Sequence, residues 1–193
     1  MFFDRDGVLT ELVPDPATGE LESPHSVADL RLRRGTTAAL RALRRAGFEL
    51  FVVSNQPSFA KGKIDLETLR RIAGAFERRL AASGVTLRAA YYCFHHPDGV
   101  VPGYGRACRC RKPSPHFVKT AARGYGIDLS RSWFVGDRET DVECGRRAGC
   151  RTVLVGRRVA RSRPSPAPDR MAQNVAAAVR SILRQARAAD GNT

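Results

Sequence analysis

The chain begins with residues 1–7, MFFDRDG, in which three apolar residues are followed at once by an acidic stretch. An apolar run that ends in aspartate is typical of a buried strand whose carboxyl end meets a ligand. Asp4 and Asp6 are two positions apart, so an extended backbone would direct both side chains to the same side. Gly7 then allows the backbone to turn. This stretch predicts a strand that carries a pair of carboxylates at its end.

The remaining sequence alternates between short apolar runs, which predict strands, and segments with helical spacing. We expect strands at residues 1–4, 48–53, 91–94, 133–136 and 152–155, and helices that end at Gly47, run from Asp65 to Gly84, run from Pro115 to Gly124 or Gly126, and span residues 140–148. Residues 157–168 are rich in Arg, Ser and Pro and predict a linker before a terminal helix at about 171–189. The pattern predicts one α/β domain over residues 1–193, a Rossmann-like parallel sheet with helices on both faces.

Three further polar runs belong with the first one. They are Ser54 to Gln56 (SNQ), Arg111 to Pro113 (RKP) and Gly136 to Asp141 (GDRETD). Each run alone is ordinary turn, loop or helix-capping sequence. The first and third follow predicted strands, and parallel sheets bind ligands at the carboxyl ends of their strands. We therefore expect all four runs to meet in one phosphoryl-transfer site.

The residue types fit an aspartate-based phosphoryl transfer. A phosphate ester repels nucleophiles unless cations neutralise its charge. Asp4 is the candidate nucleophile, and Asp6 is the candidate acid that protonates the leaving oxygen and then the base that activates water. Ser54 offers a hydroxyl and backbone amides to the phosphoryl oxygens, and Lys112 supplies positive charge. Asp137 adds a hard oxygen ligand for Mg²⁺.

A second cluster lies between the run at residues 54–56 and the run at residues 111–113. Cys93 and His95 are followed, after twelve intervening residues, by Cys108 and Cys110. Three thiolates and an imidazole are the ligand set of a structural zinc site, which would fix a loop (residues 93–110) rich in Gly and Pro. A disulfide from Cys93 to Cys108 or Cys110, unliganded buried thiols, and His96 in place of His95 remain alternatives at this point. Zinc is favoured because the cluster is so short.

The four runs resemble the motifs of the haloacid dehalogenase superfamily of phosphatases. The resemblance extends from residues 4–9 (DRDGVL) through residues 54–56 and 111–113 to Gly136 and Asp137. It covers most of residues 1–155. It is closest to the branch that contains the D-glycero-D-manno-heptose 1,7-bisphosphate 7-phosphatases and the histidinol-phosphate phosphatases. That branch carries a zinc loop with the same Cys-x-His and Cys-x-Cys arrangement.

The resemblance implies a Mg²⁺-dependent phosphatase that acts through an aspartyl-phosphate. It implies that Mg²⁺ is held by Asp4, by the backbone carbonyl of Asp6 and by Asp137. From its position in the same run, Asp141 is expected as a further ligand or as an acceptor that supports the ligands. It implies that the zinc ligands are Cys93, His95, Cys108 and Cys110. We expect the substrate to be contacted by Asn55, Gln56, Arg111 and Arg138. We also expect the zinc loop to position Arg111 and Lys112, because Cys110 immediately precedes them.

Departures from the family pattern affect the expected substrate. Thr10 stands where the family usually has Asn, residues 11–20 differ from the usual loop, and residues 57–63 replace a Gly-rich turn that contains Arg. The leading expectation is hydrolysis of heptose 1,7-bisphosphate at position 7. Histidinol phosphate and the 3′-phosphate of a polynucleotide are the alternative substrates. No long insertion follows either motif, so we expect no large cap domain.

The formal net charge of +14 suits a nucleic-acid partner, and a zinc-stabilised nucleic-acid-binding module is the non-enzyme alternative. We favour a compositional origin, because the charge comes mainly from arginine on predicted helix faces without interleaved aromatics. The charged residues that the chemistry requires are all present, which argues for an enzyme: Asp4, Asp6, Lys112 and Asp137. We therefore expect a phosphorylated sugar as partner, no nucleic acid, no membrane and a monomer. With no export signal or long apolar run, we expect a cytoplasmic protein.

Overall fold

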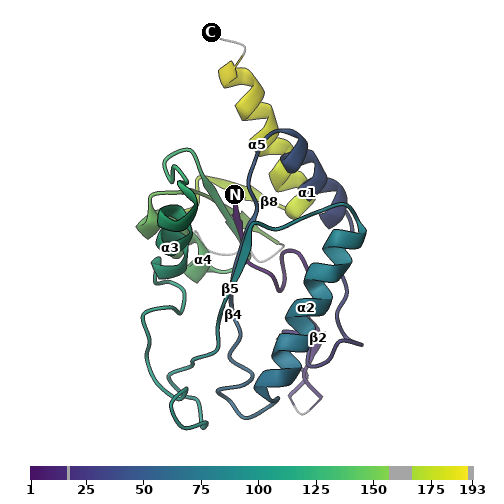
Figure 1. Ribbon diagram of the computed structural model, residues 1–193, viewed down its shortest axis with the longest axis vertical. Coiled ribbons are helices and arrows are strands. Elements are labelled where there is room, and N and C mark those ends of the chain that lie inside the picture. Colours follow the sequence, from purple (N-terminus) through teal and green to yellow (C-terminus); the bar gives the residue numbers. More distant parts are fainter. Residues whose placement is uncertain (17, 157–166, 191–193) are drawn as a thin grey trace.

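The computed structural model describes residues 1–16, 18–156 and 167–190, and its centre is a six-stranded parallel sheet (Figure 1). The strands are β1 (Phe2–Phe3), β4 (Phe51–Asn55), β5 (Ala89–Cys93), β6 (Trp133–Gly136), β7 (Arg151–Val155) and β8 (Arg170–Ala172). Their order is β5-β4-β1-β6-β7-β8, and every neighbouring pair is parallel. The direction of winding reverses beside β1, which is where such sheets bind ligands.

Helices cover both faces of the sheet, as predicted (Figure 1). One face packs against α1 (Thr36–Arg45), α2 (Leu66–Ala82) and α5 (Val175–Asp190), and the other against α3 (His116–Tyr125) and α4 (Glu139–Ala148). Neighbouring residues of one strand serve opposite faces: Phe3 belongs to the first core, whereas Phe2 belongs to the second. The Phe2 ring stacks on Phe51 with the centroids 5.1 Å apart. The α/β fold is therefore confirmed.

Two helix signals in the sequence act as predicted. The side chain of Asp65 accepts a hydrogen bond of 2.6 Å from the backbone N–H of Thr68 and caps α2. Helix α3 ends at Gly126, whose φ of 64° is the left-handed conformation that glycine adopts without strain. The choice between Gly124 and Gly126 is thereby settled in favour of the second.

The predicted start of the C-terminal helix, at about residue 171, was wrong. Residues 170–172 form β8, which pairs with β7, and α5 begins only at Val175. A three-residue strand carries no periodicity that distinguishes it from the first turn of a helix. Strand β4 likewise begins at Phe51 instead of residue 48 and continues through Asn55. Most of the predicted linker, residues 157–166, lies outside the described residues.

A small hairpin that the sequence did not predict lies between β1 and α1. Strands β2 (Val13–Pro14) and β3 (Leu21–Glu22) pair antiparallel. Among the described residues, only this hairpin lies between β1 and α1, and only a loop lies between β4 and α2. Neither segment is large enough to form a cap domain. None of the helices in the described part of the chain is long and apolar enough to cross a membrane.

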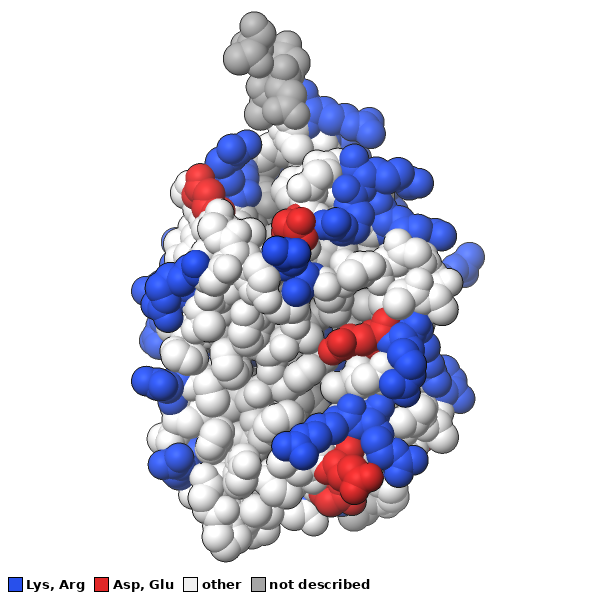
Figure 2. Space-filling view, viewed as in Figure 1, with Lys and Arg blue, Asp and Glu red and all other residues white. Residues whose placement is uncertain are grey.

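Basic side chains lie on helices and in loops. In the view of Figure 2 they follow both sides of the molecule and leave a broad area without charge between them. Helices α1 and α5, which pack together, carry exposed arginines on their outer faces: Arg41, Arg44, Arg45, Arg180, Arg184 and Arg187. The predicted location of arginine on helix faces therefore holds for these residues, whereas many other basic residues lie outside the helices.

Candidate active site and cysteine–histidine cluster

A cleft of about 800 Å³ opens at the carboxyl ends of β1, β4 and β6. Asp4 and Asp6 reach it from the end of β1, and Asp137 reaches it from the end of β6. Arg111 and Lys112 come from the segment that follows the 93–110 loop. The four polar runs of the sequence therefore meet in space, as expected from their positions beside the sheet.

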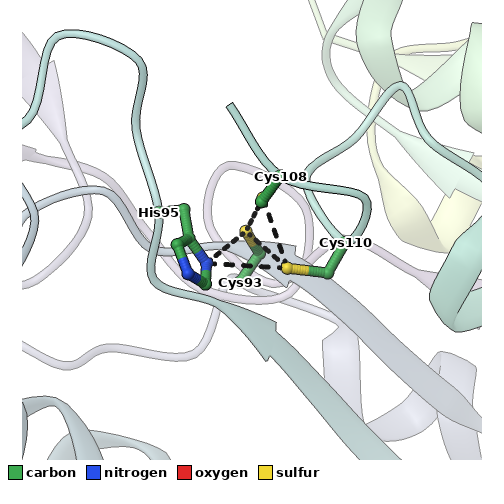
Figure 3. A group of neighbouring side chains, drawn as sticks. All are labelled: Cys93, His95, Cys108 and Cys110. Atoms are coloured by element: carbon green, nitrogen blue, oxygen red, sulfur yellow. Dashed lines mark hydrogen bonds between the residues drawn. The ribbon is translucent and has the colours of Figure 1, made fainter. Parts of the chain in front are cut away.

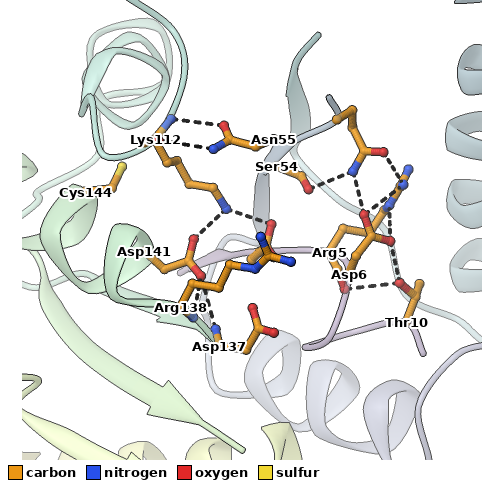
Figure 4. Close-up of polar contacts among 12 residues, drawn as sticks. Arg5, Asp6, Thr10, Ser54, Asn55, Lys112, Asp137, Arg138, Asp141 and Cys144 are labelled. Carbon is orange, nitrogen blue, oxygen red and sulfur yellow. Dashed lines mark hydrogen bonds and ion pairs between the residues drawn. The ribbon is translucent and has the colours of Figure 1, made fainter. Parts of the chain in front are cut away.

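Lys112 lies between two carboxylates (Figure 4). Its Nζ is 2.7 Å from Asp4 Oδ1 and 2.6 Å from Asp141 Oδ1, and the residue is only 4% exposed. Burial alone would lower the pKa of Lys112, but the charges of Asp141 and Asp4 outweigh it and raise that pKa. Burial raises the pKa of Asp4, and Lys112 opposes this shift. The ammonium group thus remains charged and keeps the Asp4 carboxylate in place.

Asn55, the last residue of β4, fixes the backbone of Lys112. Its amide nitrogen donates to the Lys112 carbonyl at 3.2 Å, and its amide oxygen accepts from the Lys112 N–H at 3.0 Å. Asn55 lines the cleft, where we expected a substrate contact. The structure shows that both ends of its amide already bind protein. Its observed contribution is to hold Lys112 beside Asp4.

The carboxylate of Asp6 is bound by three side chains (Figure 4). Arg5 Nε and Nη2 donate to its two oxygens at 3.0 Å each, and Thr10 Oγ1 donates at 2.9 Å. Gln56 Nε2 lies 2.5 Å from Asp6 Oδ2 and 3.0 Å from the hydroxyl oxygen of Ser54. Burial raises the pKa of Asp6, but Arg5 and these hydrogen bonds outweigh it and hold the pKa below its usual value. Asp6 therefore stands in the site as an oriented carboxylate.

Sequence reasoning missed the part played by Arg5 and misplaced Gln56. Arg5 is 1% exposed, and its guanidinium also donates to Gln56 Oε1 at 2.7 Å. Gln56 and Ser54 are each 1% exposed and lie behind Asp6, outside the residues that line the cleft. In an extended strand Arg5 would point away from its acidic neighbours, so no spacing signal could have indicated this contact. The contact of Thr10 with Asp6 had one signal in the sequence, because Thr10 departs from the family pattern at that position.

Asp141 organises the turn between β6 and α4. Its Oδ2 accepts hydrogen bonds from the backbone N–H groups of Asp137 at 3.1 Å and Arg138 at 3.0 Å. A carboxylate in the first turn of a helix is favoured by the unpaired N–H groups there. Arg138 itself is exposed and lines the cleft. Asp141 thus connects this turn to Lys112.

The carboxylates of Asp4, Asp137 and Asp141 form a group whose ligand oxygens all lie within 4.8 Å of one another. Asp137 Oδ1 is buried and has no hydrogen-bond partner among the described residues. Burial, followed by the charges of Asp4 and Asp141, raises the pKa of Asp137 to about 7. Gly7 permits the close approach, because a Cβ atom there would lie 2.3 Å from Asp137 Oδ2. This donor set fits a hard divalent cation.

Cys93, His95, Cys108 and Cys110 converge as predicted (Figure 3). The three Sγ–Sγ distances are 3.5, 3.3 and 3.3 Å, and His95 Nδ1 lies 3.9 Å from Cys93 Sγ and 3.7 Å from Cys110 Sγ. A disulfide would need about 2.05 Å, and all the cysteines are free. Tetrahedral zinc with bonds of about 2.3 Å to sulfur would separate the sulfurs by only slightly more than is observed. The donor set therefore fits zinc.

His96 and Arg111 complete the surroundings of this cluster. His96 Nδ1 accepts from the backbone N–H of Asp98 at 3.1 Å, and His96 is not part of the group whose ligand atoms converge. Arg111 Nη1 donates to the carbonyl of His95 at 3.2 Å. Burial raises the pKa of Cys93, which disfavours its thiolate unless a cation binds. The cluster is thus attached directly to the basic segment that enters the cleft.

Comparisons with known proteins agree with this geometry. The family model for HAD-hydrolase-like proteins matches residues 109–178. A D-glycero-D-manno-heptose-1,7-bisphosphate 7-phosphatase of Thermosynechococcus vestitus is 36% identical over 192 residues and covers 94% of both chains. A D-glycero-alpha-D-manno-heptose-1,7-bisphosphate 7-phosphatase of Photorhabdus laumondii is 32% identical over 148 residues, 77% of this chain and 76% of the relative.

A solved structure extends the match to the whole fold. The D,D-heptose 1,7-bisphosphate phosphatase of B. bronchiseptica, complexed with magnesium and phosphate, has a TM-score of 0.78 and 29% identity, and the match covers 96% of this chain and 98% of that one. The family resemblance inferred from the four motifs is thereby confirmed. The chain belongs to the haloacid dehalogenase-like phosphatases, in the family of the D-glycero-D-manno-heptose-1,7-bisphosphate 7-phosphatases, and is a phosphoric monoester hydrolase.

Proposed function

We propose that this protein removes the 7-phosphate from D-glycero-D-manno-heptose 1,7-bisphosphate by way of an aspartyl-phosphate at Asp4. The observation that carries the proposal is the position of Asp4 at the end of β1, with the Lys112 ammonium 2.7 Å from its carboxylate and Asp137 in the same cluster. Family membership at 36% identity over nearly the whole chain supports the sugar substrate.

In the first step an oxygen of Asp4 attacks phosphorus, and the bond from phosphorus to the sugar oxygen breaks. Asp6 gives a proton to the leaving oxygen. The Arg5 contact favours the ionised form of Asp6 and so opposes this role. The negative phosphate that enters beside Asp6 favours the protonated form and offsets that effect. Lys112 stabilises the charge on Asp4 and on the transferring group.

In the second step water attacks the aspartyl-phosphate, which releases inorganic phosphate and restores Asp4. Asp6, now ionised, takes the proton from the water. The contacts with Arg5, Thr10 and Gln56 hold the Asp6 carboxylate in one orientation for this transfer. Preorganised groups of this kind lower the cost of reaching the transition state.

We assign the magnesium site to the Asp4 and Asp137 carboxylates and the backbone carbonyl of Asp6. The orphaned Asp137 Oδ1 supports this assignment. Bound Mg²⁺ supplies positive charge to the phosphoryl group. Asp141 is already bound to two backbone N–H groups and to Lys112, so we place it as the acceptor that supports the site. We assign zinc to the cysteine–histidine cluster, where it holds the 93–110 loop.

Mg²⁺ affinity is expected to fall as the pH drops below about 7. The pKa of Asp137 is raised to about 7, so below that pH a proton must leave before the carboxylate can bind the cation. The Kd should rise about tenfold for each pH unit in that range. Calorimetric titration in buffers of different ionisation enthalpy would detect the released proton, and Asp137→Asn should abolish its release. Proton release that is the same in this variant would contradict the assignment.

The substrate is tested by phosphate release from a panel of phosphorylated metabolites with Mg²⁺. The panel contains both anomers of heptose 1,7-bisphosphate, histidinol phosphate and a DNA oligonucleotide with a 3′-phosphate. We expect the highest kcat/KM for a heptose bisphosphate, with position 7 cleaved and position 1 retained. A panel in which another compound leads would show that the substrate assignment is wrong.

A further inference from the structure

Lys63 joins two segments that are distant in the sequence. Its Nζ lies 2.6 Å from Asp15 Oδ2 and 2.6 Å from Glu22 Oε1. Both acidic residues belong to the β2–β3 hairpin (residues 13–16 and 18–22), whereas Lys63 ends the loop of residues 57–63 that follows β4. These are the two segments that depart from the family pattern. The structure brings them together through a single ammonium group.

The hairpin holds both carboxylates in fixed positions. Asp15 is 5% exposed, its N–H donates to the Glu20 carbonyl at 2.7 Å, and its Oδ1 accepts from the N–H of Thr18 at 3.0 Å. Glu22 lies opposite Val13 in the strand pair, and its Oε2 is 3.2 Å from His25 Nε2. The two acids therefore present a preformed site to the lysine, and little side-chain freedom is lost when the contact forms.

The loop that carries Lys63 is anchored as well. The N–H of Lys63 donates to the Ser58 carbonyl at 2.9 Å. The Ala60 carbonyl accepts from the N–H groups of Val100 at 2.7 Å and Val101 at 3.1 Å, both in the 93–110 loop. Lys63 thus connects the hairpin to a loop that is itself bound to the cysteine–histidine loop. The hairpin is held through this chain of contacts.

The hairpin and the 57–63 loop both line the cleft. The hairpin region contributes Glu20, Leu21, Glu22 and Ser23, and the loop contributes Pro57, Ser58 and Lys61. None of the hydrogen bonds that orient Asp4 or Asp6 involves these residues. The two segments form a wall of the cleft that is separate from the groups that transfer the phosphate.

We propose that Lys63 is a positioning residue that fixes this wall and so determines how tightly the sugar part of the substrate binds. The inference rests on the proposed sugar phosphatase activity. Isolated surface ion pairs contribute little, but here one lysine satisfies two acids, one of them buried. Asp15, Glu22 and His25 have ligand atoms within 4.8 Å of one another, and the Lys63 ammonium supplies the positive charge among them.

The test compares Lys63→Met with the wild type on two substrates. For the sugar phosphate that the wild type hydrolyses best, KM should rise about tenfold while kcat stays within about twofold. For 4-nitrophenyl phosphate, which has no sugar to meet the wall, both constants should remain close to those of the wild type. Lys63→Arg, which keeps a cation in reach of both carboxylates, should restore the KM.

A second measurement does not depend on the substrate. Hydrogen exchange, followed by mass spectrometry, should be faster in the hairpin of Lys63→Met, because its opening no longer breaks the two ion pairs. Exchange in β1 and β6 should be unchanged. Lys119→Met, at an exposed lysine of α3, is the matched control and should behave as the wild type.

Three results would overturn the proposal. They are unchanged hairpin exchange in Lys63→Met, an unchanged KM for the sugar phosphate, and an equal loss of kcat on both substrates, which would place the defect in the catalytic centre. Failure of the heptose assignment is separate, because it appears in the wild-type substrate panel. The exchange experiment and the two-substrate comparison keep their meaning with any sugar phosphate that leads the panel.

Discussion

Asp4→Asn is expected to lower kcat by about 10⁴-fold or more, on every substrate, because an amide cannot form the acyl-phosphate bond. The fold should survive, since Lys112 keeps its contact with Asp141 at 2.6 Å. Phosphate release measures the loss. Intact mass spectrometry after acid quench should show a phosphorylated wild type and no phosphorylated variant.

The matched control is Asp98→Asn, the same chemical change at a side chain that is 89% exposed. It should leave kcat unchanged. If Asp4→Asn releases phosphate at the wild-type rate, Asp4 is not the nucleophile. If DNA then binds in a salt-dependent manner without hydrolysis, the binding-module alternative replaces the enzyme.

The second large effect is expected for the double variant Cys108→Ser/Cys110→Ser. It should lose bound zinc and about a hundredfold in kcat/KM, because residues that orient a site from outside it contribute effects of this size. Cys110 is two residues before Lys112, and Arg111 donates to the His95 carbonyl, so a loosened cluster displaces both basic side chains. Elemental analysis measures the zinc, and steady-state kinetics measure the turnover.

Two neighbouring histidines provide the control for this experiment. His95→Gln removes a group that lies 3.7 Å from Cys110 Sγ, so zinc and activity should both fall. His96→Gln removes a side chain outside the cluster and should retain both. Full activity in a zinc-free double variant would show that the cluster does not position Lys112.

The main features of the fold were predictable because they depend on local patterns. Apolar runs indicated strands β1, β4, β5, β6 and β7, and Asp65 and Gly126 marked helix ends. Strand β8 and the β2–β3 hairpin were not predictable, because their two or three residues show no alternation and, unlike the buried apolar pair of β1, are partly exposed. Their existence depends on partners that only the folded chain brings near.

In the site, residue types and order indicated the residues that converge, but not every partner. Asp4, Lys112 and Asp137 lie together as expected from the ends of parallel strands. The buried fork of Arg5 on Asp6 and the amide of Asn55 on Lys112 were not foreseen. Arg5 lies in the bend after β1, and Asn55 binds a residue 57 positions away, so no local periodicity indicates either contact.

The two ion pairs of Lys63, with Asp15 and Glu22, have a consequence for protein engineering. The β2–β3 hairpin and the 57–63 loop share one ammonium group between two carboxylates, so neither half is complete alone. A chimaera that takes only the hairpin from a relative would bring in a surface without its matching cation, and one that takes only the 57–63 loop would remove the cation that Asp15 and Glu22 share. Exchange of substrate preference between relatives should therefore succeed only when both segments are transplanted together.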